Sequence, residues 1–177
     1  MDSPLIIWRR EARWAIRPRL SATHGSARQR AKMLDIMKTL VREKDICVLA
    51  TASDNKPHCS LMAYVTNSQC TAIYMVTHKD SKKYRNLTAN PWVSLLIDTR
   101  HEDMSSARIK TRALTVSGIF QPIPDTDQKK HVRAKLLEKH PHMEQFATHR
   151  DAEVFSIRIE SFLLLEGPTK AHFETLK

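Results

Sequence analysis

The spacing of apolar residues along the chain predicts helices and strands in a definite order. From Met33 to Val41 the apolar positions recur at helical intervals, and Ser26 begins a capping-box pattern, so we predict a helix over about 27–44. After it the pattern changes to the short apolar or alternating runs that strands show. The further elements we expect are strands over 46–52, 58–65, 70–77, 92–98, 109–122 and 153–166, and helices over 81–89 and 125–140.

Many of the predicted strands follow one another without a helix between them. Two consecutive hairpins over 46–77 imply an antiparallel meander, because parallel neighbours would need a long crossover. Gly118 lies inside a long strand and indicates a bulge or the close approach of another backbone. We therefore expect a mainly β (α+β) fold, an antiparallel barrel with helices packed outside it.

The net charge of +10 is concentrated near the N-terminus. Residues 1–32 hold eight lysines or arginines against two acids, whereas the rest of the chain is only mildly basic. By composition, residues 1–25 are a basic N-terminal extension and 26–177 a single domain. The extension fits a transit peptide or a basic arm, but we favour a solvated segment that packs Trp8 and Trp14. The nearly balanced charge of the body argues against a nucleic-acid partner.

Composition excludes several classes of site. The three glycines, Gly25, Gly118 and Gly167, are too few and too far apart for a glycine-rich phosphate loop or a nucleophile elbow. No apolar run reaches the ~20 residues that a membrane span needs. The three cysteines show neither a disulfide framework nor zinc spacing, so we expect reduced thiols in a cytoplasmic protein.

The segment from Asp80 to Lys83 lies where a predicted strand leads into a helix. Two lysines, a hydroxyl and free helix amides there, with Thr77 nearby, would form an anion site. Lysine in a first turn opposes the helix dipole, which a bound phosphate would explain; a solvated lysine pair is the alternative. The histidines have no metal-site spacing, and we expect them on the surface. No pair of residues marks a nucleophile or an acid–base couple.

Two stretches of this sequence resemble the pyridoxamine 5′-phosphate oxidase-like FMN-binding split barrels. They read DICVLATASDNKPHCSLMAYV and AIYMVTHKDSKKYRNLTANPWVSLLID, and the order of elements follows the family over roughly 35–170. The resemblance implies an antiparallel split β-barrel of about six to seven strands with peripheral helices. It also implies a homodimer with the flavin at the subunit interface and both chains contributing to the site.

The resemblance also assigns residues to the cofactor. Lys82 and Lys83 match the basic pair that holds the FMN phosphate, and the strand from Ser60 to Tyr64 matches the one along the isoalloxazine edge. The candidate cofactor-binding residues are Ser60, Leu61, Met62, Ala63, Tyr64, Val76, Thr77, Ser81, Lys82, Lys83 and Arg112, with Arg112 and Trp92 as contacts from the partner side. No catalytic or metal-binding residue is assigned.

Departures from the pattern bear on function. Ser60 stands where the oxidase proper has an arginine, Ala113 where it has a glutamine near the ring, and 166–177 lacks its arginine–histidine segment. These differences point away from pyridoxine 5′-phosphate oxidation and toward related flavin reductase-like and haem-degrading proteins. We expect an FMN-dependent oxidoreductase acting on an unidentified small molecule, and the alternative is a flavin- or haem-binding protein without flavin turnover.

Overall fold

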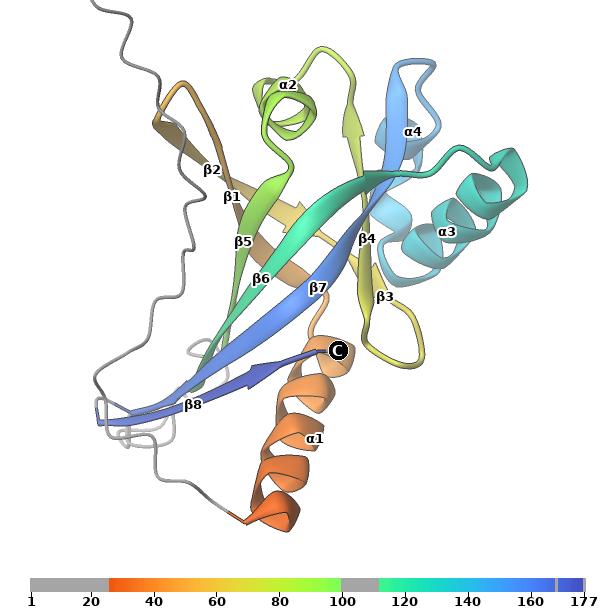
Figure 1. Cartoon of the computed structure of the whole chain (residues 1–177). Helices are drawn as coiled ribbons and strands as arrows, with labels where there is room; N and C mark the ends of the chain where they lie inside the picture. Colours follow the sequence, from red (N-terminus) through yellow and green to blue (C-terminus); the bar gives the residue numbers. More distant parts are fainter. Residues whose placement is uncertain (1–25, 100–111, 168, 177) are drawn as a thin grey trace, which may run out of the picture.

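A computed structural model describes residues 26–99, 112–167 and 169–176, and within them one antiparallel sheet curls into a half-barrel (Figure 1). The predicted extension at 1–25 lies outside the described residues, as does the start of the strand expected over 109–122. The strands are β1 (Ile46–Ser53), β2 (Lys56–Ala63), β3 (Val65–Thr66), β4 (Ala72–His78), β5 (Trp92–Asp98), β6 (Arg112–Pro122), β7 (Ala152–Glu166) and β8 (Lys170–Thr175). The helices are α1 (Ala27–Glu43), α2 (Lys82–Ala89), α3 (Thr126–Lys139) and α4 (Glu144–Ala147), and the 3₁₀ turn η2 (Pro141–Met143) precedes α4.

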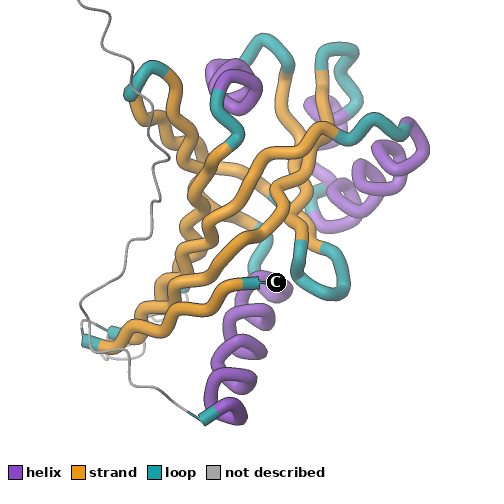
Figure 2. Tube along the Cα trace, in the orientation of Figure 1, coloured by secondary structure: helices purple, strands orange, loops and turns teal. Residues whose placement is uncertain are grey.

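Each of the three longer helices begins at a capping side chain, and Ser26 is the cap that the sequence predicted. The side chains of Ser26, Ser81 and Asp125 accept hydrogen bonds from the backbone amides three residues later, which satisfies amides that have no partner inside the helix. The boundaries of α1, α2 and α3 therefore confirm the predictions to within one or two residues. Figure 2 shows these helices at the ends and on one side of the sheet.

The predicted meander is only half correct. The strands are ordered β2-β1-β5-β6-β7-β4-β3, with β8 added beside β7. The first hairpin is present as β1–β2, with Asp54 and Asn55 at positive φ in its turn. The second is much shorter than predicted, because the strand expected over 58–65 breaks at Tyr64, whose backbone amide donates to Asp45 O. Only β3 then pairs with β4, and the long partner of β4 is β7.

The last strand was not predicted. β8 pairs with β7 from Ser161 to Glu166, although Gly167 and the following proline indicated the end of the sheet. Its apolar positions, Ala171 and Phe173, do alternate with polar ones, but a run of six residues carries little signal by itself.

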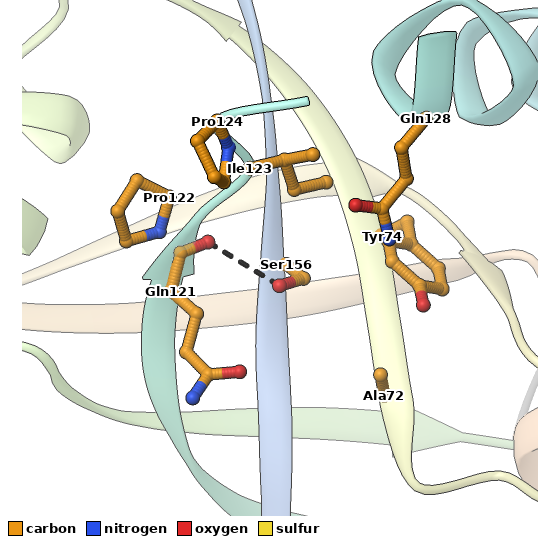
Figure 3. A pocket seen from close by; sticks show the side chains of 8 residues that line it. All are labelled: Ala72, Tyr74, Gln121, Pro122, Ile123, Pro124, Gln128 and Ser156. Atoms are coloured by element: carbon orange, nitrogen blue, oxygen red, sulfur yellow. Dashed lines mark hydrogen bonds between the residues drawn. The ribbon is translucent and has the colours of Figure 1, made fainter. Parts of the chain in front are cut away.

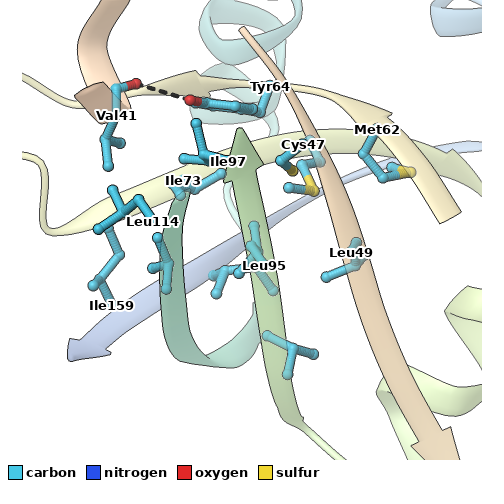
Figure 4. Close-up of a cluster of buried hydrophobic side chains, with 14 of the residues drawn as sticks. Val41, Cys47, Leu49, Met62, Tyr64, Ile73, Leu95, Ile97, Leu114 and Ile159 are labelled. Atoms are coloured by element: carbon cyan, nitrogen blue, oxygen red, sulfur yellow. Dashed lines mark hydrogen bonds between the residues drawn. The ribbon is translucent and has the colours of Figure 1, made fainter. Parts of the chain in front are cut away.

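The main core lies on the concave, inner face of the sheet. It is formed by the inward residues of every long strand, by Leu87 of α2 and by Met37, Leu40 and Val41 of α1. Tyr64 is fully buried there and donates a hydrogen bond from its hydroxyl to Val41 O at 3.1 Å (Figure 4). The hydroxyl thus fixes the end of α1 against the strand break.

A second, smaller core lies under α3 and α4. Val76 of β4 and Val154 of β7 pack there against Val132 and Leu136 of α3. His140, at the end of α3, is buried, so the expectation of surface histidines is wrong for this residue.

The convex, outer face of β2, β1, β5, β6, β7 and β8 carries exposed apolar side chains. Helices α1 and α2 pack on the opposite, inner face. Large hydrophobic side chains exposed on the outer face are Ile46, Leu61, Trp92, Leu96, Leu165 and Phe173. Leu61 is 74% exposed and Trp92 is 61% exposed, which is unusual for side chains of this size in a monomer.

Candidate functional site

The start of α2 brings three predicted residues together. Ser81 caps the helix by accepting a hydrogen bond from the Tyr84 amide at 3.3 Å. Its Oγ also lies 3.1 Å from Thr77 Oγ1 at the end of β4, and Lys83 Nζ donates to the same Thr77 oxygen at 3.4 Å. Strand end, turn and helix start therefore converge on one cluster of two hydroxyls and one ammonium group.

The start of α2 carries two consecutive lysines, with Asp80 in the turn before the helix. The first turn of α2 contains no acid, and among the described residues neither Lys82 nor Lys83 forms an ion pair with a carboxylate. The amides of Lys82 and Lys83 precede the first intrahelical hydrogen bond, from Arg85 N to Ser81 O. The Lys83 ammonium and the two hydroxyls of the cluster, with Lys82 and two unpaired amides at the same helix start, are groups of the kind that bind a phosphate dianion.

The edge strand β2 supplies backbone rather than side chains. Met62 points into the core, and Leu61 points out of the convex face. β2 is the last strand of its sheet and pairs with β1 along one edge. Its other edge presents a row of N–H and C=O groups from Ser60 to Ala63, which can bind the polar edge of a flat heterocycle.

Two buried polar residues that sequence analysis had not assigned join α2 to β2. Asn86 of α2 donates from Nδ2 to Thr51 Oγ1 of β1 at 3.1 Å, and Thr51 donates to His58 O of β2 at 3.4 Å. His58 Nε2 in turn lies 3.3 Å from Ser60 Oγ. The sequence did contain a signal for Thr51: it continues the alternation of Cys47 and Leu49 on the inward face of β1, and a polar residue at a core position indicates a hydrogen-bond partner.

Three predicted residues are placed apart from this cluster. The side chain of Tyr64 is in the main core, and that of Val76 is in the second core under α3. Arg112 lies at the beginning of β6. Helix α2 leads into the beginning of β5, which pairs with the other end of β6 through Trp92 and Ile119. The Arg112 guanidinium is paired with Glu166 at 3.0 Å. Within one subunit Arg112 therefore does not meet Lys82 and Lys83.

Burial sets the ionisation of two residues near the site. It raises the pKa of the Cys47 thiol to about 12 and also raises the pKa of the Tyr64 hydroxyl. Both groups are thus held neutral in the core, where they serve packing rather than proton transfer. The described residues contain no cluster of three or more metal-ligating side chains.

A pocket of about 470 Å³ lies elsewhere, between β4, the end of β6 and α3 (Figure 3). Tyr74, Gln121, Gln128 and Ser156 line it with Pro122 and its neighbours, and the lining residues are all uncharged. Tyr74 alternates with the inward residues Ile73 and Met75, so the pocket opens on the other face of β4 from the core. Without a cation it is a poor site for a phosphate.

Comparison with known proteins identifies the family of this chain. Residues 33–165 match the sequence model of the pyridoxamine 5′-phosphate oxidase family. A pyridoxamine 5′-phosphate oxidase homologue of Schizosaccharomyces pombe is 26% identical over 141 residues, which cover 64% of this chain and 74% of that protein.

Solved structures share the fold. A haem-binding protein from Mycobacterium smegmatis superposes with a TM-score of 0.68 at 19% identity, covering 78% of this chain and 56% of that one. This chain thus spans little more than half of the mycobacterial protein. A FAD-binding protein from Mesorhizobium loti superposes with a TM-score of 0.59 at 22% identity, covering 75% of this chain and 90% of that one. In the described part of this chain, no helix is long and apolar enough to cross a membrane.

Proposed function

Because the chain belongs to the pyridoxamine 5′-phosphate oxidase family, we propose that it binds FMN and acts as an FMN-dependent oxidoreductase on a small molecule. The observation that carries the proposal is the hydrogen-bonded cluster of Thr77, Ser81 and Lys83 at an acid-free helix start. Cations at this end of a helix are unfavourable unless an anion binds between them.

The residues of this chain fit the two ends of FMN. Lys82 and Lys83 would neutralise the phosphate. Buried Thr77 can donate to Ser81, which leaves the Ser81 hydroxyl and the first amides of α2 to donate to the phosphate oxygens. The free backbone edge of β2, from Ser60 to Ala63, would bind the polar edge of the ring. The flavin, when bound, supplies the redox chemistry, and the protein orients it and controls access to it.

The proposal includes a homodimer formed through the convex face. Leu61 of β2 and Trp92 and Leu96 of β5 lie in one exposed apolar surface, and association would remove it from water. In such a dimer Arg112 and Trp92 can serve the partner's flavin, which would explain why Arg112 lies far from Lys82 in its own subunit. We place the protein in the cytoplasm because Cys47, Cys59 and Cys70 are unpaired thiols.

Binding of a flavin or haem without turnover is the second candidate. The likeness in fold to the mycobacterial haem-binding protein favours it. The two candidates differ in the bound group and in turnover, and the visible absorption spectrum of the purified protein separates bound flavin from bound haem.

The test is a titration of the apoprotein and of the double variant Lys82→Ala/Lys83→Ala with FMN and with riboflavin, followed by flavin fluorescence. Two charge-assisted contacts of about 1.5–3 kcal/mol each predict a loss of FMN affinity of roughly two to four orders of magnitude. Riboflavin affinity and the stability of the apoprotein should hardly change. Equal FMN affinity in both proteins would overturn the assignment of the phosphate site.

A further inference from the structure

We propose that Thr51 and Asn86 are positioning residues that set the distance between the phosphate-binding and ring-binding parts of the site. The inference rests on the proposed function, since it gives a role to two residues that would not touch FMN. It concerns the hydrogen-bonded chain from α2 through β1 to β2.

The two hydrogen bonds connect the elements that would hold opposite ends of the ligand. Asn86 lies four residues after Lys82 and three after Lys83, so it is on the neighbouring turn of the same side of α2. Its Nδ2 donates to Thr51 Oγ1, which donates to the carbonyl oxygen of His58. The next residue on the same face of β2 is Ser60, where the ring-binding backbone begins.

Burial makes this connection sensitive to small changes. Thr51 is 2% exposed and Asn86 is 6% exposed, so water cannot easily replace a lost partner. If the Thr51 hydroxyl is removed, the amide of Asn86 stays buried without its acceptor, and α2 can recover the loss only by shifting or tilting. Such a movement changes where Lys82 and Lys83 lie relative to β2.

A purely structural role makes a different prediction. Weaker packing between α2 and β1 would lower the melting temperature and would affect FMN and riboflavin alike. A positioning role instead lowers the advantage of FMN over riboflavin, because only FMN must reach α2 and β2 together.

The experiment compares the full-length wild type with two variants. Thr51→Val keeps the shape of the side chain but removes its hydroxyl, whereas Thr51→Ser keeps the hydroxyl and loses the methyl group. For each, the dissociation constants of FMN and riboflavin are measured by flavin fluorescence, with the melting temperature of the apoprotein beside them. We expect Thr51→Val to weaken FMN binding by about tenfold or more, as lost supporting contacts commonly do, and riboflavin binding by clearly less. Thr51→Ser should retain most of the wild-type preference for FMN over riboflavin.

Asn86→Ala serves as a second variant if Thr51→Val does not fold, and it should reduce the preference in the same way. Equal losses for FMN and riboflavin would overturn the positioning role while leaving the proposed function intact. A wild type that binds riboflavin as tightly as FMN would instead overturn the phosphate site, and this inference with it.

Discussion

At the scale of single residues, the positive charge of Lys83 lies beside a hydroxyl group and not beside a carboxylate. Lys129, for comparison, meets Glu153 at 2.5 Å, whereas Lys83 meets the hydroxyl of Thr77. A carboxylate beside Lys83 would neutralise it and compete with any bound anion. The choice of neighbour therefore distinguishes Lys83 from Lys129.

Another residue-scale consequence concerns Cys47 and pH. Its folded-state pKa is raised to about 12 by burial, from 9.0 for an exposed thiol, so the folded state favours the neutral form. Its contribution to stability is complete below about pH 9 and is lost as pH rises toward 12. From about pH 8 to about pH 10, this thiol should reduce the free energy of unfolding by about 1.4 kcal/mol.

Urea denaturation of wild type and Cys47→Ala at these two pH values checks the prediction. The variant is less stable at both, because it loses packing, but its stability should fall less between them. Parallel losses in the two proteins would contradict the account. Tyr64 has a pKa raised chiefly by burial and in part by Cys47, and its burial holds it neutral in the folded state of both proteins over this pH range, so its effect cancels in the comparison.

The sequence allowed part of the site to be predicted, for a physical reason. Thr77, Ser81, Lys82 and Lys83 are close together along the chain, so a strand end followed by a capped helix brings them together automatically. The Thr51–Asn86 contact joins residues 35 positions apart, and it depends on which face of β1 the helix covers. Arg112 could be placed only by the length and pairing of β6.

At the scale of elements, local patterns predicted most boundaries, and long-range pairing caused the errors. Capping residues predicted α1, α2 and α3 because a cap acts within one turn. The second hairpin is shorter than predicted because the strand breaks at the buried Tyr64, and that burial includes the distant contact with Val41. β8 was not predicted because Gly167 and the following proline, which separate it from its partner β7, are residues that commonly end a strand.

The predicted irregularity at Gly118 is confirmed and yields a stability prediction. The register of β6 against β7 shifts between Ser117 and Gly118, and a Cβ on Gly118 would lie 2.5 Å from Ile157 Cγ2 and 2.6 Å from Arg158 O. Because the second contact is with backbone, the strands must move to admit a methyl group. Gly118→Ala should therefore cost about 1–3 kcal/mol of unfolding free energy.

Ser117→Ala is the matched control, because Ser117 lies next to Gly118 in β6 and points to the convex face. Its change should stay within about 0.5 kcal/mol in urea denaturation. If Gly118→Ala were as stable as this control, the close approach of β7 would not be the reason for glycine at this position.

At the scale of the whole molecule, the two faces of the sheet differ in what covers them. The concave face is filled by the core and closed by α1, while the convex face leaves Leu61 and Trp92 in water. A sequence pattern can predict that outward positions are apolar, but it cannot show that Leu61, Val48 and Leu96 lie side by side across β2, β1 and β5. That row comes from the strand pairing and supports the proposed dimer.

Sedimentation velocity of the purified protein incubated with FMN, recorded at the visible absorption band of oxidised flavin, tests the central claim most directly. The account predicts that bound flavin absorbance sediments with a species of twice the 20.4 kDa chain mass. The chromophore released from that species should be FMN. Flavin absorbance that remains with free, slowly sedimenting FMN, while the protein sediments without it, would contradict the account.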